Sequence, residues 1–106
     1  MKIFKKLTAY LKLRKAIIMA EEEHVKTGNR YYVAPSEHKG RIVLLIVDKH
    51  EFKKLKRKHY IDRKANLHDL ENECVYCTAY ADGKRALSEE VKIAKKERYY
   101  YECGAI

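Results

Sequence analysis

The longest apolar run of the chain lies between residues 41 and 47, where the sequence reads Arg-Ile-Val-Leu-Leu-Ile-Val. Six consecutive apolar residues, four of them β-branched, predict a strand buried on both faces, since a half-exposed strand would alternate apolar and polar positions. We therefore expect this strand at the centre of the core. Asp48 follows it, and its short side chain can cap the free N–H groups of a new helix, with Glu51 favourably placed in the first turn.

The helix that Asp48 introduces is strongly basic. Phe52, Leu55 and His59 fall on one stripe at helical spacing. Cations take the rest of its surface: Lys53, Lys54, Lys56, Arg57 and Lys58. The most apolar element of the chain thus leads directly into the most cationic one.

Residues 1 to 26 predict a long amphipathic helix. Its apolar stripe at helical spacing is formed by Phe4, Leu7, Leu11 and Ile18. Lysines and arginines interrupt every apolar run, so the helix is too polar to span a membrane, and no small-residue cleavage pattern of a secretion signal follows. Basic residues before position 16 and glutamates at positions 21 to 23 oppose the helix dipole, so packing of the apolar face must offset that cost.

Two further segments predict strands. Residues 30–34 are rich in β formers, and Pro35, which cannot donate to a ladder, places this strand at a sheet edge. A turn ending at Gly40 closes a hairpin onto the strand at 41–47. The third strand is expected at residues 74–81, with Val75, Cys77 and Ala79 on one face and Cys74, Tyr76, Thr78 and Tyr80 on the other.

The remaining segments are less patterned. Residues 62–73 are polar and mixed, and we expect mostly loop there. Ser88 is a good cap for a final helix reaching about Cys103, with Val91, Ala94 and Tyr101 close to one stripe.

The element order helix, strand, strand, helix, strand, helix predicts an α+β fold. We expect a single domain over residues 1–106 with a three-stranded, mainly antiparallel sheet, three helices and no flexible linker. Helices are expected against one face of the sheet, with the long first helix packed either on the sheet or on a partner chain. Three short strands cannot easily cover a first helix of about 36 Å. Part of its stripe, at Phe4, Leu7 and Leu11, is therefore expected to form a homodimer contact.

Charge suggests a class of partner. The chain has 24 Lys plus Arg against 15 Asp plus Glu, a net charge of +9, and its 46% apolar content argues against disorder. A polyanionic partner is therefore the first hypothesis. The alternative is that the excess charge only keeps a small protein soluble.

The spacing Cys74-x-x-Cys77 superficially matches half of a zinc site or a thiol redox pair. Residues three apart in a strand point to opposite faces, so we expect small buried thiols and no metal. A chain with three cysteines and no export pattern is expected in the reducing cytoplasm.

Catalytic patterns are also missing from the sequence. Replication nickases pair a tyrosine nucleophile with histidines around a metal, but the histidines here never occur as the alternating pair that would serve the tyrosines at 99–101. There is no glycine-rich phosphate loop and no nucleophile in a recognisable turn. We expect a protein that is not an enzyme and has no cofactor.

Basic residues combined with tyrosines give the best functional hypothesis. Phosphates bind mobile positive charge and unpaired bases stack on flat rings, which predicts nucleic-acid binding with little sequence preference. The candidate residues are Lys49, Lys53, Lys54, Lys56, Arg57, Lys58, Arg63, Lys64, Tyr76 and Tyr80. Three alternatives stay open: a merely solvated basic face, a protein-interaction or homodimerisation module, and binding of the first helix to a membrane surface.

The segments Thr27-Gly-Asn-Arg-Tyr-Tyr-Val-Ala-Pro and Phe52-Lys-Lys-Leu-Lys-Arg-Lys-His-Tyr-Ile, with Val47-Asp-Lys between them, resemble small basic proteins of gut-bacterial microvirus-type phages and mobile elements. This resemblance implies an accessory role in a DNA-containing element. It brings no activity and no functional residues, and it favours DNA over RNA as the partner.

Overall fold

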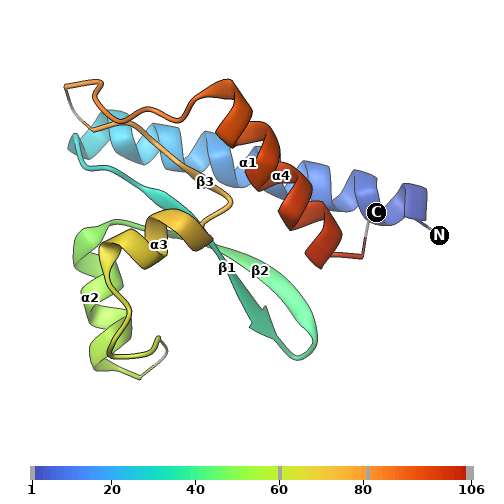
Figure 1. The fold of residues 1–106 in the computed structure, drawn as a ribbon, viewed down its shortest axis with the longest axis horizontal. Helices are drawn as coiled ribbons and strands as arrows, with labels where there is room; N and C mark the ends of the chain where they lie inside the picture. The colour runs from blue at the N-terminus through green and yellow to red at the C-terminus, as the bar shows by residue number, and fades with distance from the viewer. Residues whose placement is uncertain (1, 60, 81, 105–106) are drawn as a thin grey trace.

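The computed structural model describes residues 2–59, 61–80 and 82–104, with the backbone alone for residues 2–4. Along the chain it contains α1 (Lys2–Thr27), β1 (Tyr32–His38), β2 (Arg41–Val47), α2 (Lys49–Arg57), α3 (Leu67–Glu73), β3 (Tyr76–Cys77) and α4 (Glu89–Glu102). The α+β class, the long first helix and the antiparallel three-stranded sheet are confirmed. The described ranges contain one helix more than predicted (Figure 1).

The order of the strands differs from the predicted one. The sheet runs β2-β1-β3, so β1 is the central strand and β2 lies at an edge. Ile42, Leu44 and Ile46 of β2 pack against the core, whereas Val43 and Leu45, which point to the other face, are exposed. The expectation that β2 is buried on both faces is therefore wrong. The sequence of β2 does not alternate between apolar and polar residues, because the exposed positions of this edge strand are apolar as well.

Pro35 lies in the central strand and not at an edge, contrary to the prediction. The carbonyls of Tyr31, just before β1, and of Val33 accept hydrogen bonds from the N–H groups of Thr78 and Val75, so these alternate residues turn their backbone groups toward the β3 segment. Pro35 continues that alternation, but β1 pairs with β3 only at Tyr32 and Val33. The N–H that proline lacks would thus point to a place before β3 begins at Tyr76, so no ladder bond is lost.

Helices cover both faces of the sheet, not one face as predicted (Figure 1). On one face, side chains of α1 and α4 meet the sheet in a cluster that includes Leu13, Val33 and Tyr99. On the other, α2 and α3 contribute Phe52 and Leu70 to a second cluster. The sheet is therefore the middle layer of three, which explains how so small a sheet forms two apolar clusters.

The buried side of α1 consists of three alanines and one leucine. Its contacts with the sheet come mainly from Ala9, Leu13, Ala16 and Ala20. The predicted stripe points elsewhere: Leu7, Leu11 and Ile18 are 53%, 53% and 47% exposed, while the side chain of Phe4 lies outside the described residues. None of the helices in the described ranges is long and apolar enough to cross a membrane.

The segment expected to be mostly loop contains α3. Asn66 caps it by accepting a hydrogen bond from the backbone N–H of Asp69, and the Asp69 carboxylate accepts one from the N–H of Asn66. Leu70 is its buried anchor. A seven-residue helix with one buried side chain leaves no periodic signal in a sequence, which is why the prediction missed it.

Helix α4 begins with the predicted cap, but the face that it buries differs from the predicted one. The hydroxyl of Ser88 accepts a hydrogen bond of 3.2 Å from the N–H of Val91, as expected. The predicted stripe is wrong, because Val91, Ala94 and Tyr101 are exposed and Lys95 and Tyr99 are the buried residues of α4. A polar residue inside and a tyrosine outside reverse the pattern that hydrophobicity favours.

Candidate nucleic-acid interface

Helix α2 begins where the sequence predicts. Asp48 Oδ1 accepts a hydrogen bond of 2.8 Å from the backbone N–H of Glu51, which completes the expected cap. Phe52 is buried and Leu55 is half-buried against the sheet. His59 lies beyond the end of the helix at a φ of 63°, exposed, so its predicted place on the inner stripe is wrong. With its inner side held by Phe52, α2 turns its cations outward.

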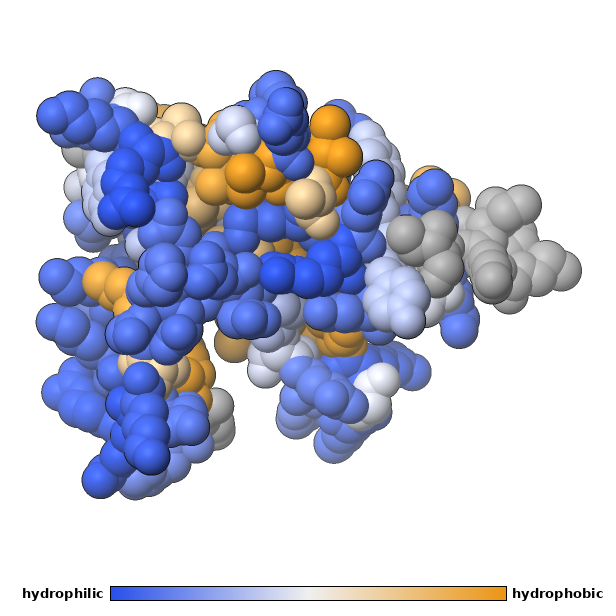
Figure 2. Space-filling view, in the orientation of Figure 1, coloured by the Kyte–Doolittle hydropathy of each residue, from blue (hydrophilic) through white to orange (hydrophobic). Residues whose placement is uncertain are grey.

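An open hollow along α2 is lined only by basic side chains and one imidazole. We name it the basic hollow; it measures about 660 Å³ and is lined by His50, Lys53, Lys56, Arg57 and Arg63. Hydrophilic side chains cover this part of the molecule at the lower left of Figure 2. None of the ion pairs formed among the described residues uses a side chain between positions 49 and 64. The cations of the basic hollow are therefore available to an external anion.

A second hollow adjoins the first, because His50 and Lys53 line both. We name it the aromatic hollow; it measures about 670 Å³, and its other walls are Gly28, Asn29, Arg30, Tyr32, Asp48, Lys49, Leu67, Tyr80 and Asp82. Its carboxylates already have backbone partners, since Asp48 caps α2 and Asp82 accepts a hydrogen bond from the N–H of Lys84. The exposed ring of Tyr80 gives this hollow a flat surface beside the cations of α2.

A buried guanidinium supports that ring. Arg30 Cζ lies 4.8 Å from the centre of the Tyr80 ring and 5.4 Å from that of Tyr32. Its Nε donates to the carbonyl of Thr78 at 2.9 Å, and Nη2 donates to Cys77 Sγ at 3.0 Å. Burial acts to lower the pKa of Arg30, but the Tyr80 hydroxyl and the Cys77 sulfur outweigh it, and the net shift is upward. A permanently charged Arg30 therefore holds the Tyr80 ring in place.

The structure gathers most of the predicted binding residues around the two hollows: Lys49, Lys53, Lys56, Arg57, Arg63 and Tyr80. Lys54, Lys58 and Lys64 are exposed but line neither hollow. Sequence reasoning missed His50 and Arg30. The spacing of His50 three residues before Lys53 carries a signal, since residues three apart share a helix face. Arg30 carries none, because its partners lie far along the chain.

Tyr76 lies apart from the other candidates. It packs with the cluster beneath α1, and its hydroxyl donates a hydrogen bond of 2.5 Å to Glu21 Oε1. Burial, with this hydrogen bond as the next cause, raises the pKa of Tyr76. The sheet therefore separates the Tyr76 ring from the cations of α2, on the opposite face.

The two thiols of the Cys74-x-x-Cys77 motif lie on the same side of the sheet, in the cluster with Phe52. The expectation that they point to opposite faces is wrong, because β3 spans only Tyr76–Cys77 and Cys74 is the C-cap of α3. A hydrogen bond between the thiols lowers the pKa of Cys77, with Arg30 adding to the effect, and raises the pKa of Cys74. Both thiols are buried and neither lines a hollow.

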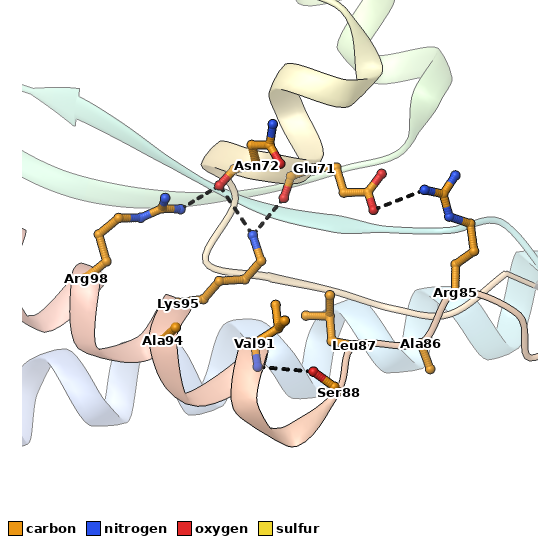
Figure 3. Close-up of a pocket in the computed structure, with 10 residues that line it drawn as sticks. All are labelled: Glu71, Asn72, Arg85, Ala86, Leu87, Ser88, Val91, Ala94, Lys95 and Arg98. Atoms are coloured by element: carbon orange, nitrogen blue, oxygen red, sulfur yellow. Dashed lines mark hydrogen bonds and ion pairs between the residues drawn. The ribbon is translucent and has the colours of Figure 1, made fainter.

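A third hollow lies between α3 and α4 (Figure 3). The Lys95 side chain crosses it from α4, and its Nζ donates to the carbonyl of Glu71 at 2.7 Å. The same Nζ donates to the carbonyl of Cys74 at 2.9 Å. Arg98 donates to the carbonyl of Asn72 at 2.8 Å, and Arg85 pairs with the Glu71 carboxylate at 3.6 Å. Lys95 and Arg98 thus satisfy carbonyls at the C-terminal end of α3, and Arg85 is paired with one of its side chains. Since all three cations already have partners within the fold, this hollow is part of the scaffold.

Metal ligands are not gathered anywhere in the ranges 2–59, 61–80 and 82–104, where no three His, Cys, Asp or Glu side chains stand close enough to hold an ion. Comparison with family models, with curated proteins and with solved structures finds no match for this chain. Its function is therefore inferred from the two joined hollows beside α2.

Proposed function

We propose that this protein is a non-catalytic accessory protein that binds nucleic acid, DNA in preference to RNA, without strong sequence preference. The observation that carries the proposal is the junction of the basic hollow with the aromatic hollow through His50 and Lys53. Clustered Lys and Arg neutralise phosphates, and an exposed ring stacks an unpaired base. The joined hollows offer both contacts on one surface.

The spacing of the cations supports the same proposal. Lys53, Lys56 and Arg57 are three and four residues apart on α2, so they share one face of the helix. Lys56 Nζ also lies 5.6 Å from the centre of the Phe52 ring, which directs its stem along the apolar anchor. Flexible ammonium groups are point charges that follow a phosphate backbone but do not distinguish bases, which fits binding without sequence preference.

A salt titration with single-stranded DNA, duplex DNA and RNA of one sequence tests the proposal. If about four to six phosphates are neutralised, the logarithm of the binding constant falls with the logarithm of salt concentration at a slope of roughly −3 to −5. Absence of binding at low salt would end the nucleic-acid proposal. The three nucleic acids in parallel also measure the preference for DNA.

A second candidate function is self-association as a homodimer. Leu7 and Leu11 of the predicted contact are exposed, on the side of α1 away from the sheet. Large apolar side chains in a row on a surface are typical of contact sites. An interaction module without a nucleic-acid role would show only weak binding to DNA and RNA that vanishes near physiological salt.

We place the protein in the cytoplasm. Support comes from its cysteines, because Cys74, Cys77 and Cys103 are all free thiols, and the first two lie together in the core without a disulfide. Thiols in such proximity stay reduced in a glutathione-buffered compartment. This location also agrees with an accessory role in a DNA-containing element.

A further inference from the structure

An apolar stripe on α1 faces away from the core. Besides Leu7, Leu11 and Ile18 it includes Val25, which is 82% exposed. Separations of four, seven and seven residues keep these side chains on one side of a helix with 3.6 residues per turn. The opposite side of the helix packs on the sheet through Ala9, Leu13, Ala16 and Ala20. Leu11, Ile18 and Val25 recur every seven residues, as one of the two seam positions of a heptad does, while the other seam position holds Leu7, Arg14 and Glu21.

Charge is divided along the same helix. The first turn holds no acidic residue, and the cations before position 16 are Lys2, Lys5, Lys6, Lys12, Arg14 and Lys15. Glutamates follow at positions 21, 22 and 23. This order is unfavourable for the dipole of the helix itself. It becomes favourable when a second helix of the same sequence lies alongside in the reverse direction, since each basic half then meets an acidic half.

We propose that α1 pairs with α1 of a second copy of this chain in antiparallel orientation along the stripe. This inference rests on the self-association proposed above and adds its surface and its direction. With the two-fold axis near Ala16, Leu7 lies beside Val25 of the second copy. Arg14 then lies within about one helical turn of Glu21 of the second copy, whose Oε1 also accepts the hydrogen bond from Tyr76 of its own chain. The stripe extends for about 27 Å from Leu7 to Val25 at 1.5 Å per residue.

The parallel orientation is disfavoured by the same residues. In a parallel pair Arg14 would lie beside Arg14 of the second copy, and Glu21 beside Glu21. Like charges along both halves of a seam oppose association. A membrane surface is a poorer occupant for a similar reason: an anionic surface attracts the basic half but repels the glutamates that flank the Val25 end of the stripe.

Cysteine cross-linking tests the direction of the pairing. Thr8 and Glu22 are exposed positions next to the stripe, and the antiparallel pair brings Thr8 of one copy near Glu22 of the other. Thr8→Cys and Glu22→Cys are made in the full chain with Cys103→Ser, because Cys74 and Cys77 are buried. We expect a disulfide-linked dimer when the two variants are mixed and oxidised, and at most about a tenth as much from either variant alone. A mixture that gives no more cross-linked dimer than either variant alone overturns the antiparallel pairing.

Light scattering on wild type, Leu11→Asp and Ile93→Asp identifies the surface. Ile93 of α4 is 55% exposed, close to the 53% of Leu11, so it is a matched control for a charge placed on exposed apolar surface. We expect a dimer for wild type and Ile93→Asp and a monomer for Leu11→Asp, with unchanged circular dichroism in all three.

The outcomes separate the two proposals. A wild-type monomer at high micromolar concentration overturns both self-association and the antiparallel pairing. A dimer that Leu11→Asp leaves intact keeps self-association but overturns the α1 surface, and points to another one such as the open edge of β2. A monomer that co-sediments with vesicles of anionic lipid, and loses this property on Leu11→Asp, assigns the stripe to a membrane and likewise overturns the pairing.

Discussion

The Lys95 ammonium lies 2.7 Å from the carbonyl oxygen of Glu71, in the last turn of α3. The same ammonium donates to the carbonyl of Cys74, so a side chain of α4 satisfies acceptors that the end of α3 leaves open. A positive charge at a helix C-terminus is also favoured by the helix dipole. This contact links helices that lie on opposite faces of the sheet, and it explains why a lysine is buried in α4.

Replacing Lys95 is expected to destabilise the fold. Lys95→Met keeps the length of the side chain but removes the short ammonium contacts with the carbonyls of Glu71 and Cys74, which then keep only the Cys74 thiol at 3.2 Å and Arg98 at 3.3 Å. We expect a cost of about 1 to 3 kcal/mol of the free energy of unfolding. Urea denaturation measures it. Lys96→Met is the matched control, because Lys96 is exposed, and we expect it to stay within about 0.5 kcal/mol of wild type. Equal effects of the two variants would show that the contact with α3 adds nothing to stability.

The local features of this fold were readable in the sequence. The cap of Asp48, the anchor Phe52 and the cap of Ser88 depend on neighbours within one helical turn, and all three are confirmed. The hairpin of β1 and β2 was predicted for the same reason. A cation-rich helix with a single buried aromatic side chain can pack in only one way, so the outward direction of the α2 lysines followed as well.

The long-range features were not readable. Arg30 makes its hydrogen bonds with Cys77, Thr78 and Arg85, which lie 47, 48 and 55 residues away, and no local pattern encodes such partners. The order of the strands was not readable because an apolar run such as β2 is compatible with a central position in the sheet and also with an edge position. The face of α1 was misjudged because alanines carry less hydrophobic signal than leucines, although they permit closer packing.

The free energy of unfolding is expected to fall at alkaline pH because buried tyrosines lose their protons, in addition to any effect of the lysines. Burial raises the pKa of Tyr32 to about 12, and it also raises the pKa values of Tyr76 and Tyr99. A tyrosine whose pKa is higher in the folded state binds its proton more tightly there, so its contribution is fully present below the unfolded value of about 10 and is lost as the pH rises. The free energy of unfolding should fall between about pH 10 and 12.

Urea denaturation at several pH values, with tyrosinate absorbance as a second signal, checks this expectation. Tyr32→Phe should flatten the decline, because phenylalanine does not ionise. Tyr101→Phe, at an exposed position of α4, should leave the decline unchanged. A decline that is equally steep in all three proteins would show that the buried Tyr32 hydroxyl is not its source.

Variants of Tyr80 and Tyr76 are expected to distinguish a ring that stacks on bases from a ring that supports the fold. Tyr80→Ala removes the exposed ring of the aromatic hollow and should weaken binding of single-stranded DNA by about 1 to 3 kcal/mol while leaving the salt slope nearly intact. Tyr76→Phe should leave DNA binding unchanged and lower the free energy of unfolding by about 0.5 to 1.5 kcal/mol, because it loses the hydrogen bond to Glu21. Fluorescence anisotropy measures the first effect and urea denaturation the second. Loss of binding in Tyr76→Phe would place the interface on the α1 side of the sheet.

The neighbouring residues Lys53 and Lys54 give the sharpest test of the interface. Both are exposed lysines of α2 with the same charge, but Lys53 lines both hollows and Lys54 lines neither. Lys53→Gln should lower the magnitude of the salt slope by about one unit, as the loss of one phosphate contact does. Lys54→Gln should change it by less than about a third of a unit, because a charge outside the hollows acts only through screened long-range attraction. Salt titrations of both variants with one duplex and one single-stranded oligonucleotide measure the difference. Equal changes in slope would mean that DNA contacts the basic surface of α2 as a whole, and that the hollows do not define the path of the bound strand.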